Sequence, residues 1–190
     1  MLAKWWWKLK TEKGRLWTRI IWSFHHNSSS WCYIPVSVSM PGVWKSIGKI
    51  GKDLLKCNVD LTKLISGKVG KGDQVRFWID KWLGNDSFDK LFPSLFNKEV
   101  SKSCTIKERY NIVGRNIIWE WSWNVSNFNP QEQMELNNLS QLLLQANITN
   151  EEDAWRWEDP PNFSFSVNCI KRLCQKQSDR VWEERMDTNL

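Results

Sequence analysis

Four lysines recur at helical spacing within residues 41–56 and could together bind a polyanion. Steps of four, three and four residues separate Lys45, Lys49, Lys52 and Lys56. On a helix, these steps place the four side chains in one wedge of about 60°, opposite an aliphatic stripe formed by Val43, Ile47, Ile50 and Leu54. A row of ammonium groups can contact successive phosphates and release their counterions. The spacing therefore predicts a helix that binds nucleic acid through its lysine face.

Four further cations lie in and after a glycine-rich segment, and we expect them to extend the phosphate contacts. They are Lys68, Lys71, Arg76 and Lys81. Tryptophans beside cations, such as Trp78 and Trp82 next to Lys81, are able to stack on unpaired bases. The alternative is that most of the 15 tryptophans fill cores, because an indole buries a large apolar area.

The sequence holds no arrangement typical of a catalytic or metal centre. Gly42 and Gly48 enclose five residues instead of the four of a phosphate-binding loop, and they lie inside a helical pattern. Five cysteines and two adjacent histidines do not form the close pairs that a tetrahedral zinc site needs. The carboxylate runs at 151–153 and 183–184 lie in polar sequence, where solvation is the usual role. We expect no catalytic residue, no metal and no cofactor.

The charge and the cysteine content limit which partners and which cellular compartment fit the sequence. Residues 1–95 carry 16 Lys+Arg and 7 Asp+Glu, whereas residues 96–190 carry 11 and 14. A basic half favours a polyanionic partner, and excess lysine that only solubilises the chain is the alternative. An odd cysteine count without C-x-x-C spacing favours a reducing compartment, and no apolar run reaches the roughly 18 residues of a membrane span. We expect an intracellular protein, nuclear or cytoplasmic, that is not secreted and has no membrane partner.

The elements that must position these residues are helical in the first half. The patterns predict helices over 2–13, 15–26 and 41–56, with Leu16 and Ile20 on the buried face of the second. A loop with one short strand is predicted over 27–40.

The second half mixes strands and helices. We predict a hairpin over 66–83, a strand over 117–125 and a second hairpin over 155–167. A capping box at 105–108 opens a short helix, and Asn129-Pro130 opens a longer one with Leu136, Leu139 and Leu143 buried. The predicted fold class is α+β, with a helical N-terminal half, two short Trp-rich β-hairpins and a Leu-rich helix.

Several segments in a consistent order resemble one plant protein family. Residues 69–84, which read VGKGDQVRFWIDKWLG, and residues 91–96, LFPSLF, resemble a signature of plant LINE-type (non-LTR) retrotransposon reverse transcriptases. Residues 2–9 and 43–47 resemble further segments of that family. Residues 153–157 with 163–167 resemble the start of its reverse-transcriptase zinc-binding domain. The resemblance spans residues 2–175.

The resemblance implies a fragment of a larger polyprotein, from after the polymerase core to the start of the zinc-binding domain. The parent would be an RNA-directed DNA polymerase, but its endonuclease, its palm Asp pair and its Cys/His cluster have no counterpart in this sequence. The implied division is a helical connector over 1–60, a Gly-rich hairpin unit over 61–100, helices plus a hairpin entering a truncated zinc-binding domain over 101–175, and a polar tail over 176–190.

Two functions fit these observations. The first is a non-catalytic, nucleic-acid-binding connector whose partners are RNA or DNA and the remainder of the polyprotein. The second is a structural segment that braces the polymerase and zinc-binding regions without binding nucleic acid itself. Charge reversal at the four lysines separates them, because it should abolish nucleic-acid binding but leave a brace folded.

Overall fold

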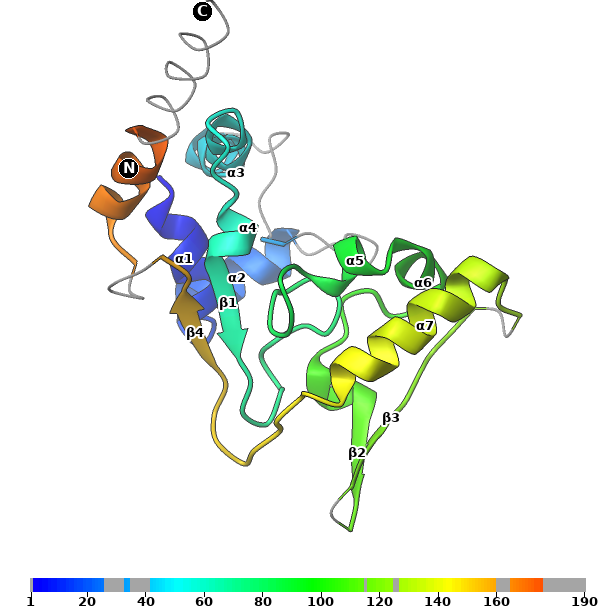
Figure 1. Cartoon of the computed structure of the whole chain (residues 1–190). Coiled ribbons are helices and arrows are strands. Elements are labelled where there is room, and N and C mark those ends of the chain that lie inside the picture. The colour runs from blue at the N-terminus through cyan, green and yellow to red at the C-terminus, as the bar shows by residue number, and fades with distance from the viewer. Residues whose placement is uncertain are drawn as a thin grey trace, which may run out of the picture. The chain divides into compact units, whose positions relative to one another are not determined.

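The computed structural model describes residues 2–25, 33–34, 42–114, 116–124, 127–159 and 165–175 (Figure 1). Contacts divide the chain into two compact units: unit 1 is Met1–Ile65 with Trp157–Leu190, and unit 2 is Ser66–Arg156. The division predicted at residues 60, 100 and 175 stays a prediction. Most of the predicted 27–40 loop, the 176–190 tail and residues 160–164 of the second predicted hairpin lie outside the described residues.

Helices account for most of the described part of unit 1. They are α1 (Lys4–Thr11), α2 (Leu16–His25), α3 (Gly42–Leu55), α4 (Leu61–Leu64) and an unlabelled helix over residues 167–175. The three helices predicted over 2–56 are confirmed within two residues at each end. The periodicity succeeded because each helix carries a buried face and apolar residues recur along it at steps of three and four.

Tryptophans join the helices of unit 1 around a small aliphatic core. Leu9, Ile21, Ile34 and Ile47 are buried together, and Trp5, Trp6, Trp17 and Trp44 pack against them. The Trp6 indole Nε1 donates to the Ile47 carbonyl oxygen at 2.8 Å. A Cβ placed on Gly51 would lie 2.3 Å from a Trp6 ring carbon, so glycine permits this close approach of α1 to α3.

The buried face predicted for α2 is wrong. Leu16 is 70% exposed and Ile20 is 43% exposed, whereas Thr18 and Ile21 are buried. Apolar residues occur on more than one side of α2, so periodicity alone did not select the packed side. The choice follows from Trp17, whose ring meets Trp5 of α1 edge-to-face at 5.3 Å.

Unit 2 combines short strands and helices, and the predicted α+β class is confirmed. Strand β1 (Ile65–Lys68) pairs with β4 (Ala154–Trp157), and β2 (Tyr110–Val113) pairs antiparallel with β3 (Asn116–Trp119). The remaining elements are α5 (Phe88–Leu91), α6 (Pro93–Lys98), the 3₁₀ helix η1 (Ile106–Arg109) and α7 (Pro130–Leu143). The chain leaves unit 1 within β1 and returns within β4.

The two predicted hairpins do not form as expected. Strand β1 pairs with β4 instead of with residues 75–79; Arg76 forms an isolated bridge with Thr105, and Ser66 of β1 forms a parallel one with Lys81. Strand β4 covers the first strand of the hairpin predicted over 155–167, but its partner is β1, and residues 167–175 are helical. The observed strand β3 is shorter than the strand predicted over 117–125, since it ends at Trp119. Alternating residues identified strands but not their partners, which are far away in sequence.

Helix α7 follows its sequence signals closely. Asn129 and Glu132 form a capping box with Pro130 at the first turn, and the capping box predicted at Thr105 is also present. Leu139 and Leu143 are buried as predicted, and Leu136 is half-buried. Glu135 is buried too, because its carboxylate accepts the backbone N–H groups of Ser94 and Leu95 at the start of α6.

Aromatic rings form the core of unit 2 around Phe77. Phe77, Trp78 and Phe88 are fully buried. Rings within about 6 Å of Phe77 belong to Trp78, Trp82, Phe88, Trp119 and Trp121. For Trp78, which is fully buried, the interpretation of tryptophan as core is therefore the correct one.

Candidate nucleic-acid interface

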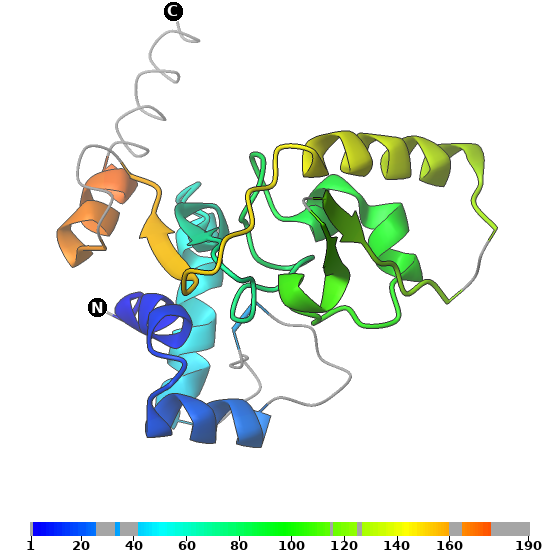
Figure 2. The same ribbon diagram turned by 90° about the horizontal axis from the view of Figure 1, so that it is seen from below.

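Figure 2 shows helix α3 beside α1 and α2; three lysines of the predicted row lie on its exposed side, and Lys56 directly follows its last residue. Lys45, Lys49, Lys52 and Lys56 are all exposed, while Ile47, Gly51 and Leu54 are buried on the opposite side. Val43 is 55% exposed at the helix start, so the aliphatic stripe is shorter than predicted. Lys56 pairs with Asp53 at 3.3 Å. Among the described residues, no acidic side chain forms an ion pair with the other three lysines of the row.

The charge around α3 belongs to unit 1. This unit carries 16 Lys+Arg against 9 Asp+Glu, whereas unit 2 carries 11 against 12. On α1, the ammonium groups of Lys4 and Lys8 lie 5.9 and 5.7 Å from the Trp5 ring. The Trp5 ring in turn contacts Trp44 of α3 at 6.3 Å. The uneven charge is therefore a property of the helical unit.

The other four predicted contacts lie in unit 2 and differ in their surroundings. Lys68 is exposed, and Lys81 is half-buried. Lys71 pairs with Glu152 at 2.5 Å and with Asp73 at 3.3 Å, and these hydrogen bonds raise its pKa above the usual value.

The phosphate contact at Arg76 stays a prediction, and the structure places this side chain in a buried ion pair. Its side chain is 8% exposed and its guanidinium donates to both carboxylate oxygens of Asp80, at 3.3 and 2.9 Å. A guanidinium held in this way is not free to approach a phosphate. The arginine was singled out because its charge was visible in the sequence, whereas its burial was not.

The glycine-rich loop binds a carboxylate of its own chain. Asp153 accepts four backbone N–H bonds: Oδ1 from Gly70 and Gly72 at 2.7 and 2.8 Å, and Oδ2 from Gln74 and Val75 at 2.8 and 3.2 Å. The loop is held tightly, since a Cβ on Gly70 would lie 2.1 Å from the Glu151 carbonyl oxygen. Converging backbone donors of this kind bind anions. Here the anion is Asp153, so two of the segments that carry the family resemblance, residues 69–84 and 153–157, form one structural motif.

The buried carboxylate of Glu99 organises part of the aromatic core. Glu99 accepts hydrogen bonds from the Trp78 indole Nε1 at 3.0 Å, the Arg109 guanidinium at 2.8 Å and the Ser101 backbone N–H at 2.8 Å. Its side chain is completely buried. Such a charge is tolerated only because several donors surround it. Sequence reasoning missed Glu99, because nothing local distinguishes it from a solvated acid.

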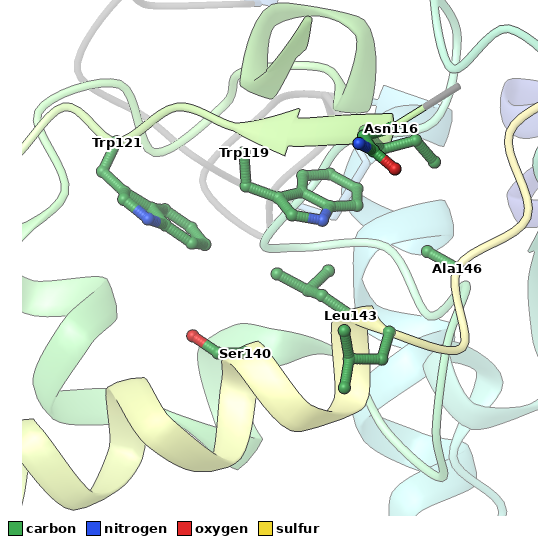
Figure 3. Close-up of a pocket in the computed structure, with 8 residues that line it drawn as sticks. Asn116, Trp119, Trp121, Ser140, Leu143 and Ala146 are labelled. Carbon is green, nitrogen blue, oxygen red and sulfur yellow. The ribbon is translucent and has the colours of Figure 1, made fainter. Parts of the chain in front are cut away.

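A cleft of about 520 Å³ lies between β3 and α7 in unit 2 (Figure 3). Trp119 and Trp121 extend from one wall toward Ser140 and Leu143 of α7 on the other. The remaining lining residues are Asn116, Ile117, Leu144 and Ala146. The sequence shows that Trp119 and Trp121 alternate along the chain, but it does not show that α7 forms the facing wall of the cleft.

Two cysteines, Cys104 and Cys169, are buried. Burial raises the pKa of Cys104 to about 12. The Cys169 thiol donates to Asp159 and accepts from the Trp157 indole at 3.1 Å, and burial followed by the Asp159 hydrogen bond raises its pKa. The described residues contain no group of three or more His, Cys, Asp or Glu that could hold a metal ion. Within the same ranges, no helix has the length and apolar character to cross a bilayer.

Comparison with known proteins finds one curated relative. It is an Arabidopsis thaliana protein named "Putative ribonuclease H protein", to which this chain is 25% identical over 173 residues. The match covers 88% of this chain and 25% of that protein, so the chain spans about a quarter of the relative's length. No protein-family profile and no solved structure matches the chain.

Proposed function

We propose that this chain is a non-catalytic, nucleic-acid-binding segment of a retroelement polyprotein, and that α3 supplies the main contact. The exposed row of Lys45, Lys49, Lys52 and Lys56 is the observation that carries the proposal. The row extends over about 16 Å at 1.5 Å per residue, which matches about five nucleotides along the axis of one strand at 3.4 Å each. A helix with this charge and no base-reading Asn, Gln or Arg on its lysine face binds by backbone charge, with little sequence preference.

Two observations support a retroelement origin. The relative's name denotes an enzyme that acts on RNA, and the match covers most of this chain. The ordered segments over residues 2–175 resemble LINE-type reverse transcriptases, in which we place the chain as the connector between the polymerase core and the zinc-binding domain. On this proposal, catalysis belongs to other parts of the polyprotein, because the chain supplies binding groups and no catalytic constellation.

The test compares two variants of the full chain that lose equal charge. In the first, Lys45, Lys49, Lys52 and Lys56 are changed to Gln; the control changes exposed lysines elsewhere, namely Lys63, Lys90, Lys107 and Lys171. Binding to a 20-nucleotide RNA, its DNA counterpart and the duplex is measured by fluorescence anisotropy at low salt. We expect the α3 variant to lose at least tenfold in affinity, and the control to lose less than threefold. Equal losses of affinity in the two variants would show that binding depends only on net charge, and would overturn the proposal.

The structural brace is a second candidate, and specific contacts favour it. Lys71, Arg76 and Asp153, all within resemblance motifs, bind other groups of unit 2. These motif residues therefore maintain the fold. If the wild-type chain is folded by circular dichroism and binds neither RNA nor DNA at low salt, the brace is the function that remains.

A further inference from the structure

The cleft between β3 and α7 has walls suited to a flat aromatic ligand. Trp119 and Trp121 line one side, with their ring nitrogens on the edge that faces α7 (Figure 3). Trp123 stacks on Trp121 at 5.3 Å and an interplanar angle of 15°, and Trp119 meets Phe77 at 5.8 Å. These contacts fix both rings before any ligand arrives, so the ligand need not bear the entropic cost of ordering them.

Polar groups with unused hydrogen-bonding capacity converge on the same cleft. They are the indole N–H groups of Trp119 and Trp121, the side-chain amide of Asn116 and the hydroxyl of Ser140. Among the described residues, none of these side-chain groups makes a hydrogen bond. Neither indole nitrogen is a buried unsatisfied atom, so both remain open to a ligand. An apolar cleft with a few oriented polar groups is the usual form of a small-ligand site.

The charge of the cleft restricts the ligand further. None of its eight lining residues is charged, so neither a phosphate nor a cation has a partner inside. The complementary ligand is a neutral, planar ring with hydrogen-bond donors and acceptors on its edge. Unpaired nucleobases have these properties, and a base inserted here would leave its phosphate outside the cleft.

We propose that this cleft binds an unpaired nucleobase of a single strand, stacked against Trp119 or Trp121 and hydrogen-bonded at its edge by Asn116 and Ser140. The site is separate from the lysine row of α3, lies in the other unit and does not depend on it. Stacking on one aromatic side chain strengthens binding by roughly 5- to 150-fold per base. The cleft would thus add a preference for unpaired over paired nucleic acid.

The test uses two probes of equal charge, a ten-nucleotide adenine DNA and a ten-residue abasic strand. In full-length protein labelled with ¹⁵N, the indole signals of Trp119 and Trp121 are assigned with the W119F and W121F variants. We expect the adenine strand to shift both signals and the abasic strand to leave them in place. The Ser140→Phe variant, which fills the cleft from α7, should lose at least fivefold in affinity for the adenine strand, whereas the control Asn138→Phe, at an exposed position of α7 that does not line the cleft, should lose less than threefold.

The outcomes separate this proposal from that for α3. In the Lys→Gln variant of α3, the two indole signals should still shift when the strand is saturating, even if overall affinity falls. Identical shifts with both strands, unmoved signals at saturation, or unchanged adenine affinity in a folded Ser140→Phe protein would each overturn the proposal. Shifts caused by a leucine-rich helical peptide but not by the adenine strand would also overturn it and assign the cleft to a protein partner.

Discussion

Removal of the Asp153 carboxylate should release the glycine-rich loop of unit 2. Three of its four hydrogen bonds to backbone N–H groups are 2.7–2.8 Å long, and the fourth is 3.2 Å. Hydrogen bonds to a charged group make a net contribution to stability of about 1.5–3 kcal/mol each. Asp153 is half-buried and water can reach part of the loop, so we expect Asp153→Ala to cost about 3 kcal/mol. Asp153→Asn should rescue only part of this, because its NH₂ group would face two N–H donors.

The assay must report on the loop itself, since a chain of two units need not unfold in one transition. Amide hydrogen exchange at Gly70, Gly72 and Gln74 provides this, and we expect exchange at these sites to accelerate by about 150-fold in Asp153→Ala, as about 3 kcal/mol implies. Glu151→Gln is the matched control, because it removes an exposed acid two residues away and should change exchange less than threefold. Unchanged protection in Asp153→Ala, or an Asn variant equal to wild type, would refute the reasoning.

Three further predictions concern packing, thiol reactivity and pH. Gly51→Ala should lower the free energy of unfolding of unit 1, measured in urea, by about 1–2 kcal/mol, because the clash of the new Cβ with the Trp6 ring costs more than alanine gains in helix propensity. An unchanged free energy of unfolding would contradict this contact. Iodoacetamide at pH 7 should label exposed Cys57 well before Cys104, because a pKa of about 12 leaves Cys104 almost no thiolate. Peptide mass spectrometry measures the labelling, and equal rates at the two cysteines would contradict the prediction. Burial raises the pKa of Asp89, so the contribution of this side chain to the free energy of unfolding is favourable below pH 3.8 and is lost as the pH rises. Asp89→Asn should therefore increase Tm more at pH 7 than at pH 4, and an equal increase at the two pH values would refute the prediction.

Local signals in the sequence predicted elements well. The helices α1, α2 and α3 and the capping boxes at Thr105 and Asn129 were all found from spacing and cap residues. These features depend on residues within four positions of one another, which is the range over which sequence patterns report directly. The exposed lysine row on α3 belongs to this class, and it was found for the same reason.

Contacts between distant residues could not be predicted. The pairing of β1 with β4 depends on Asp153 meeting the loop that begins at Gly70, 83 residues earlier. Arg76 carried a visible charge, but the sequence did not show its burial or its ion pair with Asp80. The cleft behaves in the same way, because α7 becomes its second wall only once the chain has folded. Sequence reasoning therefore located the exposed candidate site and missed the enclosed one.

The salt dependence of binding tests the central claim most directly, because it counts the phosphate contacts of α3. Affinity for duplex nucleic acid is measured from 50 to 200 mM salt for the wild type and for the variant with Gln at Lys45, Lys49, Lys52 and Lys56. Four phosphate contacts give a slope of log affinity against log salt of about −3.6, so the wild-type slope should be steeper than that of the variant by about 3–4. Slopes equal within 1, with both proteins folded, would show that the α3 lysines do not contact phosphate and would contradict the account.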